Sequence, residues 1–171
     1  MVLPQYLFIN FLQKVMQEII EVTDKMVLQE QTREWCKFPY PGHPKGCPNY
    51  GRRKDCPPQI SFVTKKFDLK KPHWFAIVSF DLAAHMKIMA LKHPDWSERQ
   101  QRCCLYWQGK VRKQLRILCV NWLKKNRDYR CSFSPEAMGV NVFRTAYHLG
   151  IKMRKSAYPT VYKVALIGKP L

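Results

Sequence analysis

Residues 74–92 read Trp-Phe-Ala-Ile-Val-Ser-Phe-Asp-Leu-Ala-Ala-His-Met-Lys-Ile-Met-Ala-Leu-Lys. The first seven are almost all apolar or aromatic, which predicts a buried β-strand over 74–80. Asp81 follows directly and is a residue type that caps helices, so we expect a helix from Leu82 to about Lys92. A strand joined to a helix through one capping residue predicts a fold that contains both a sheet and helices.

The chain after residue 92 predicts more helix. Ser97 and Gln100 resemble a capping box, and apolar residues then recur at steps of three and four, so we expect one long helix over 97–125. The apolar stripe expected to face the core consists of Cys104, Trp107, Val111, Leu115, Leu118 and Trp122. A further helix is expected to begin at Ser134-Pro135-Glu136, which supply a cap, a first-turn proline and an acid, and to end at Gly150.

The two ends of the chain complete the expected fold. Apolar residues at helical spacing predict an amphipathic helix over 5–30. Residues 161–167 alternate loosely and predict a closing strand, and 151–153 are a candidate third strand. We therefore expect an α+β fold, a small sheet packed with about four helices, in a single domain over 1–171.

Residues 35–58 differ from the rest of the chain. Six prolines and three glycines share this stretch with Cys36, Cys47 and Cys56, and this composition excludes a regular helix or a central strand. So long a loop in a compact domain needs something to order it. Thiolates are the preferred ligands of iron–sulfur clusters and zinc, so the stretch is predicted to be a long cysteine- and proline-rich metal-binding loop.

The spacing of the three cysteines favours an iron–sulfur cluster, 4Fe–4S in particular. Ten and eight residues separate them, unlike the short paired spacing of zinc fingers. A cluster accepts wide loops because its ligands bind separate iron corners. Zinc is the alternative, and His43, inside the loop, would complete a Cys₃His site.

A fourth ligand has to come from elsewhere in the chain. Cys131 is preferred because it lies three residues before Ser134, the expected cap of a helix whose positive end favours an anionic centre. Cys119 is the next candidate, although it sits beside the apolar stripe, where a cysteine is more often a small core residue. Cys104 lies on the stripe and is read as core, and the role of Cys103 stays open.

Two segments together resemble a known family. The loop that ends in Cys56-Pro57-Pro58 and the later run Cys-Ser-Phe-Ser-Pro-Glu-Ala-Met-Gly-Val-Asn-Val over 131–142 are similar to those of an uncharacterised prokaryotic family of predicted metal-binding proteins. Members of that family are suspected iron–sulfur proteins without an established reaction. The resemblance implies four metal ligands: Cys36, Cys47, Cys56 and Cys131. The family usually has a denser cysteine cluster before the Glu-Ala helix, whereas only Cys119 and Cys131 are close before it here. A second metal site is therefore not expected.

The charge of the chain is strongly positive and uneven. Lys and Arg number 30 against 12 Asp and Glu, a net charge of +18, and from residue 99 onward only Asp128 and Glu136 are acidic. So basic a surface favours a polyanionic partner, nucleic acid and RNA in particular. The residues expected to contact phosphates lie in the basic helical region 97–130: Lys110, Arg112, Lys113, Arg116, Lys124, Lys125, Arg127 and Arg130.

Three functions remain open at this point. The first is an iron–sulfur protein that acts on or beside nucleic acid, the second a redox or sulfur-handling iron–sulfur enzyme on a small molecule, and the third a zinc-stapled nucleic-acid-binding module. No Gly-rich phosphate loop, Ser–His–Asp motif or paired carboxylate site is recognisable, so the sequence indicates no reaction. Seven cysteines without a signal peptide or a long apolar run indicate reduced thiols in a cytoplasmic protein with no membrane partner.

Overall fold

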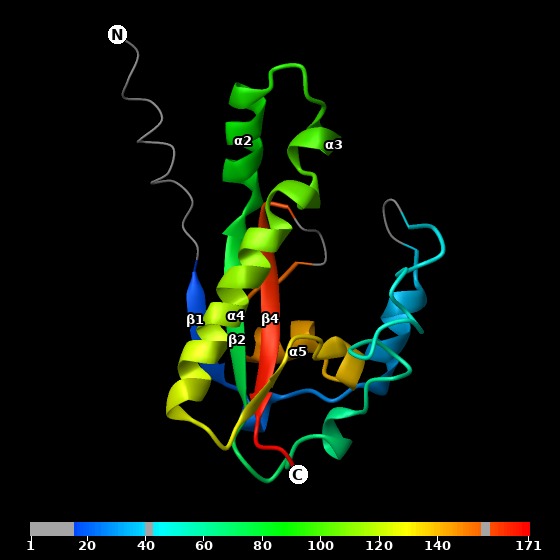
Figure 1. Cartoon of the computed structure of the whole chain (residues 1–171), viewed down its shortest axis with the longest axis vertical. Helices are drawn as coiled ribbons and strands as arrows, with labels where there is room; N and C mark the ends of the chain where they lie inside the picture. The colour runs from blue at the N-terminus through cyan, green and yellow to red at the C-terminus, as the bar shows by residue number, and fades with distance from the viewer. Residues whose placement is uncertain (1–15, 40–42, 155–157) are drawn as a thin grey trace.

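The computed structural model describes residues 16–39, 43–154 and 158–171. They form an antiparallel sheet of four strands in the order β1-β2-β4-β3, together with four α-helices (Figure 1). The strands are β1 (Gln17–Glu21), β2 (Trp74–Asp81), β3 (Arg130–Ser132) and β4 (Thr160–Gly168). The expected α+β class is confirmed, as are the strands predicted over 74–80 and 161–167.

The middle of the sheet is the pair β2 and β4. They are in register along all of β2, from Trp74 opposite Ile167 to Asp81 opposite Thr160. Alternate side chains therefore point to opposite faces, and Phe75 to Phe80 are all buried because both faces are covered. This explains why β2 reads as a continuous apolar run.

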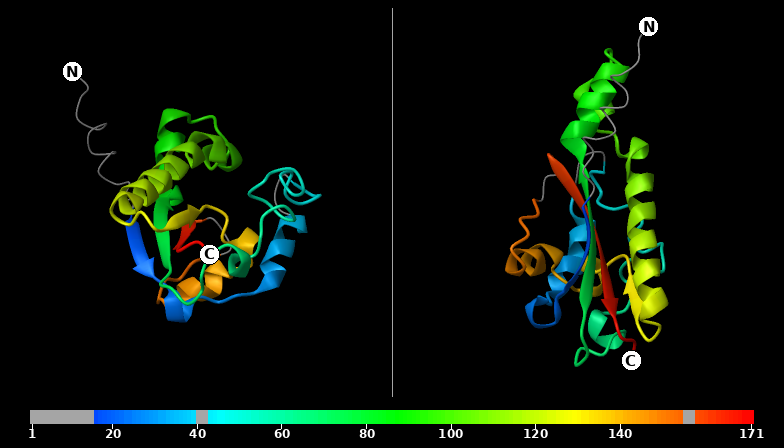
Figure 2. Two further views of the ribbon diagram at one scale, coloured as in Figure 1. Left: turned by 60° about the horizontal axis from the view of Figure 1, so that its bottom comes forward. Right: turned by 90° about the vertical axis from the view of Figure 1, so that its left-hand side faces the viewer.

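The helices lie on both faces of the sheet. The α-helices are α2 (Leu82–Lys92), α3 (Glu98–Gln101), α4 (Gln108–Lys125) and α5 (Val142–His148). Short 3₁₀ helices are η1 (Thr23–Lys25), η2 (Glu30–Lys37), η3 (Val63–Lys65), η4 (Cys104–Tyr106) and η5 (Glu136–Met138). Figure 2 shows α4 along one face and α5 on the opposite face, which gives one apolar core on each side of the sheet.

The caps predicted at Asp81 and Ser97 are confirmed, whereas Ser134 is not a cap, since Pro135 precedes η5 and no side chain caps it. The Oδ1 atom of Asp81 accepts a hydrogen bond from the backbone N–H of Ala84, 2.8 Å away, and starts α2. Ser97 and Gln100 form the expected capping box at the start of α3. These local side-chain contacts satisfy N–H groups that the helices leave without partners.

The single helix expected over 97–125 is wrong. The chain leaves α3 at Arg102, passes through η4 and starts α4 at Gln108. Trp107 accounts for this break, since its ring is buried and stacks on Phe80 at 5.1 Å while its indole N–H donates to the backbone oxygen of Arg102 at 3.3 Å. Cys104, predicted to be core, is exposed.

The rest of the predicted apolar stripe faces the sheet. Val111 and Leu115 are buried, as is Trp107, and Leu118 and Trp122 are half-buried and pack against the same core. The side of α4 that contacts the sheet is thus the one that the spacing predicts.

The helix expected over 5–30 is also wrong where the structure describes it. Residues 5–15 lie outside the described part, and from Gln17 the chain forms β1, paired with β2. The neighbours Ile19 and Ile20 would share one helix stripe, but in β1 they point to opposite faces and pack into the two cores. Long-range strand pairing therefore overrides the helical spacing.

The helix expected from Pro135 to Gly150 consists of two pieces. Gly139 has φ +86° and ends η5, and Asn141 then caps α5 by accepting from the backbone N–H of Arg144 at 3.0 Å. Gly150, with φ +78°, follows the end of α5 as predicted. Residues 151–153 form no strand, and β1 and β3 complete the sheet instead. No helix within the described ranges has the length and apolar composition to cross a membrane.

Candidate functional site

The structure brings the three loop cysteines together. Cys36, at the end of η2, and Cys47 and Cys56, on the turns that follow, line one open pocket of about 390 Å³. All three are half-buried. The other residues that line the pocket come from η2, the loop and the segment after β3: Thr32, Trp35, Asp55, Pro57, Phe133, Ser134, Glu136 and Ala137.

Backbone hydrogen bonds build the loop around this pocket. The N–H of Cys47 donates to the carbonyl of Cys36 at 2.7 Å, and the N–H of Gly51 donates to Pro57 at 2.8 Å. Gly46 has φ +80°, and a Cβ atom there would lie 2.6 Å from the carbonyl oxygen of Cys36. Only glycine fits that position. The turn at Gly46 is what brings Cys47 next to Cys36.

The electrostatics of the pocket reflect three neighbouring thiols. Burial raises the pKa of Cys36, and the nearby Cys47 and Cys56 raise it further because thiolates repel one another. Burial also raises the pKa of Cys56, with the carboxylate of Asp55 as the next cause. A cation bound among these sulfurs would offset the repulsion.

The donor set fits a thiolate-ligated metal in its chemistry. It consists of three soft sulfur ligands whose side chains open into the same pocket. As the side chains stand, no three His, Cys, Asp or Glu residues within 16–39, 43–154 and 158–171 are arranged to hold a metal ion. The three cysteines line one pocket, and their role as metal ligands stays a prediction.

Cys131, the predicted fourth ligand, is not among the residues that line the pocket. Its thiol donates to the sulfur of Cys119 at 3.1 Å, between β3 and α4. This hydrogen bond holds the proton on Cys131 and raises its pKa, and it lowers the pKa of Cys119. Cys119 is 1% exposed and lies in the core below α4, as expected for a small apolar residue.

Two charged residues near the pocket were not predicted as site residues. Glu136 lines it, and burial raises the pKa of this carboxyl group. Lys163 lies on β4, where burial and then the cation of Arg112 lower its pKa, while Glu136 acts in the opposite direction. The sequence contains a signal for each: Lys163 interrupts the apolar run of the last strand, and Glu136 is one of only two acids after residue 98.

The predicted phosphate-contacting residues are all exposed. They lie along α4, on the turn that follows it and at the first position of β3: Lys110, Arg112, Lys113, Arg116, Lys124, Lys125, Arg127 and Arg130. The ion pairs found between described residues involve other cations, namely Lys37, Arg53 and Lys169. This side of α4 is therefore a basic surface whose charge is not neutralised within the described chain.

The basic surface passes the cysteine pocket near the middle of α4 and continues beyond the end of that helix. The guanidinium group of Arg116 lies 5.9 Å from the ring centre of Phe133, which lines the cysteine pocket. At the end of α4, a hollow of about 430 Å³ is lined by residues 124–129. Tyr129, considered for base stacking, is half-buried there and packs its ring against Trp74 and Trp122 at 5.1 and 5.5 Å.

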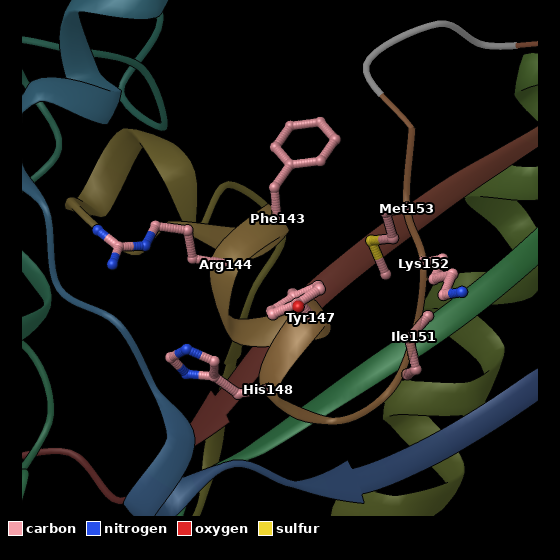
Figure 3. Close-up of a pocket in the computed structure, with 7 residues that line it drawn as sticks. All are labelled: Phe143, Arg144, Tyr147, His148, Ile151, Lys152 and Met153. Carbon is pink, nitrogen blue, oxygen red and sulfur yellow. The ribbon is translucent and has the colours of Figure 1, made fainter.

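A separate hollow of about 370 Å³ lies on α5 (Figure 3). Figure 3 shows Tyr147 in the middle, Arg144 and His148 on one side, and Lys152 and Met153 on the other. Its lining offers apolar and cationic contacts but no thiol or carboxylate. The cysteine pocket gathers more chemically reactive groups, and we place the candidate site there.

Fold and pocket define this chain as a small α+β protein with three thiols in one pocket beside a basic helix. No protein-family model matches the chain, and neither a curated protein nor a solved structure matches it. The family resemblance carried by Cys56-Pro57-Pro58 and by residues 131–142 thus stays a prediction.

Proposed function

We propose that this chain is an iron–sulfur protein whose centre is held by Cys36, Cys47 and Cys56 and which acts beside nucleic acid, RNA in particular. The observation that carries the proposal is the convergence of these three cysteines on one pocket. None of the three belongs to either apolar core: Cys36 lies at the end of η2, and Cys47 and Cys56 lie on turns rich in proline and glycine. A thiolate-ligated cluster would supply electron transfer, and an iron without a protein ligand would bind a substrate.

The residues around the cysteines support a negatively charged centre. Exposed cations on the same loop include Lys45, Arg52 and Lys54, and they would offset the charge of thiolates and inorganic sulfide. Backbone contacts at the turn around Gly46 hold Cys47 beside Cys36, so part of the entropy cost of forming the site is met by the backbone itself. Reduced thiols of this kind fit a cytoplasmic location.

Metal analysis tests the first half of the proposal. Protein purified without oxygen is expected to absorb at about 400 nm, as thiolate-ligated clusters do, and to contain iron and acid-labile sulfide. Zinc without sulfide would instead support the zinc-stapled module. A chain with neither metal would overturn the metal centre.

The second half of the proposal rests on the basic surface of α4. Eight exposed cations without acidic partners in the described chain are suited to the phosphates of a nucleic acid. Phosphate contacts carry no base information, so we expect binding with little sequence preference. Six such contacts would lose roughly a thousandfold in affinity between about 50 and 200 mM salt.

Fluorescence anisotropy with labelled RNA and DNA at two salt concentrations tests this half. Absence of binding even at low salt would remove nucleic acid from the proposal. The small-molecule iron–sulfur enzyme would then be preferred. One observation favours that alternative: Glu136, a half-buried residue whose carboxyl pKa is raised by burial, lines a pocket of about 390 Å³, which is large enough for a small substrate.

A further inference from the structure

Lys163 occupies an unusual position for a lysine. It lies opposite Val78 in the register of β2 and β4, so its side chain leaves the sheet on the face that α4 covers. Its neighbours on that face of β4, Val161 and Ala165, are buried in the core below α4. Lys163 itself is half-buried. A lysine is rarely placed inside such a row unless something pairs with its charge.

The described residues offer Lys163 no such partner. No ion pair or hydrogen bond within 16–39, 43–154 and 158–171 involves its ammonium group. The groups that act on its charge are a second cation, Arg112, which opposes it, and the Glu136 carboxylate and the Cys104 thiol, which favour it without forming an ion pair. Two cations in a partly desolvated place repel each other, and an anion bound between them would relieve that repulsion.

A third cation lies in the same region. Arg112 and Arg116 are one helical turn apart on α4 and therefore point in similar directions. Arg116 lies over the ring of Phe133, which lines the cysteine pocket. Figures 1 and 2 show α4 running along β4. The cations of α4 and β4 therefore approach the cysteine pocket from the same side.

We propose that Lys163, Arg112 and Arg116 form a binding site for an oxyanion, a phosphate group in particular, between α4 and the three-cysteine pocket. Guanidinium groups match the geometry of phosphate oxygens and can bind two at once, and a lysine adds a point charge. The proposal goes beyond the metal centre and does not depend on it, because each of the three residues belongs to α4 or β4. A lysine that only stretches toward water would show no response to an anion.

The test is the thermal stability of the full chain in inorganic phosphate, compared with sodium chloride at the same ionic strength. We expect phosphate to raise the melting temperature of the wild type in a saturable way, since a ligand of the folded state stabilises it. Lys163→Met should bind phosphate about tenfold more weakly or worse, because one charged hydrogen-bond donor is lost. Without phosphate, the same variant should melt at or above the wild-type temperature, because an unpaired cation has been removed.

Two further variants keep the test decisive. Arg112 is exposed, so Arg112→Gln should fold normally and also lose phosphate affinity. Lys87→Met, an exposed lysine of α2 outside the basic surface, is the matched control and should respond as the wild type does. A wild type that responds equally to phosphate and chloride would overturn the site, as would an unchanged phosphate response in Lys163→Met.

The source of the phosphate can be separated from the site itself. If the site takes the backbone of a nucleic acid, Lys163→Met will also weaken RNA binding. If it takes a small anion, RNA binding will stay unchanged while the phosphate response is lost, and both outcomes support the site. Iron and sulfide content measured on Lys163→Met should equal that of the wild type, so failure of the oxyanion site and failure of the metal centre are distinguishable.

Discussion

The chain holds its cysteines in two contrasting settings. Cys36 lies at the end of η2, Cys47 and Cys56 lie on the turns that follow, and all three are half-buried at one open pocket. Cys119 and Cys131 lie on regular elements, α4 and β3, with their sulfur atoms 3.1 Å apart beside the apolar core. The first group is brought together by the backbone of a loop and the second by packing.

The difference teaches that residue type alone does not identify a metal ligand. In α4, Cys119 serves as a small apolar residue, and its sulfur accepts a hydrogen bond from the Cys131 thiol. In and beside the loop, Cys36, Cys47 and Cys56 belong to neither apolar core, so core packing does not explain them. The backbone setting separates the two groups. Variants of the basic helix, the loop and the packed pair test whether they act independently.

The largest expected effect is a loss of RNA affinity when the basic surface of α4 is altered, with the metal content of the loop unchanged. Arg112→Glu with Lys113→Glu should weaken RNA binding roughly fiftyfold at about 0.1 M salt, from a slope of about 0.9 in log affinity per lost phosphate contact. Anisotropy titrations over several salt concentrations measure both quantities. Metal content should not change, since both residues lie outside the pocket lining.

The matched control for this double variant is Lys87→Glu with Lys92→Glu, which changes the net charge equally on exposed residues of α2. Equal weakening by both double variants would mean that only net charge matters. The specific assignment of the binding surface to α4 would then be lost.

The next effect concerns the turn that brings the loop cysteines together. Gly46→Ala should destabilise the loop by about 2 kcal/mol or more, since alanine at positive φ costs about 1–2 kcal/mol and its Cβ would also collide with the carbonyl of Cys36. Gly51→Ala is the matched control, with φ +71° but nothing within 4 Å of the added Cβ. Metal content and protease sensitivity of the two variants measure the difference. If both variants lose equal amounts of metal and of protease resistance, the close contact between the backbones of Cys36 and Cys47 is not what holds the site.

A smaller effect is expected in the packed pair. Cys119→Ala removes the acceptor of the Cys131 thiol and leaves a small cavity, so the free energy of unfolding should fall by about 1–2 kcal/mol. Urea denaturation measures this change. The metal content should be that of the wild type. Loss of metal from Cys119→Ala at unchanged folding would contradict the separation of the two groups.

The smallest effect is on the pH dependence of stability. Burial lowers the pKa of His73 below its ordinary value of 6.5, so the unfolded chain binds the proton first as the pH falls. The stabilisation is complete above about pH 6.5 and is lost below it, by at most about 1.4 kcal/mol per pH unit. His73→Phe should flatten this dependence in urea midpoints measured at several pH values. His85, whose pKa burial also lowers, contributes a slope of the same sign, and Glu136, whose pKa burial raises, contributes one of the opposite sign. An unaltered slope in His73→Phe would contradict the assignment.

Local signals predicted much of the fold. Asp81 and Ser97 cap helices through contacts within three residues, and the strand over 74–80 is apolar because both of its faces are buried. The stripe Trp107, Val111 and Leu115 faces the core because helical spacing holds within α4. Such features depend on neighbours in sequence, so the sequence is enough to predict them.

Features that depend on distant partners were not predictable in the same way. Ile19 and Ile20 fit a helix stripe until β2 is available as a pairing partner. The break before α4 depends on the stacking of Trp107 on Phe80, and Cys131 meets Cys119 only once β3 has joined the sheet edge. The convergence of the loop cysteines was predicted from composition. Lys163 and Glu136 were missed because only the folded chain brings their charges together.

Metal content of single cysteine variants tests the central claim most directly. Iron and sulfide per chain would be measured after anaerobic purification of Cys36→Ser, Cys47→Ser, Cys56→Ser and Cys131→Ser beside the wild type. We predict that each of the three loop variants loses most of its metal and that Cys131→Ser keeps the wild-type amount, because only the first three sulfurs line the pocket. Wild-type metal in the loop variants, or loss of metal from Cys131→Ser alone, would contradict the account.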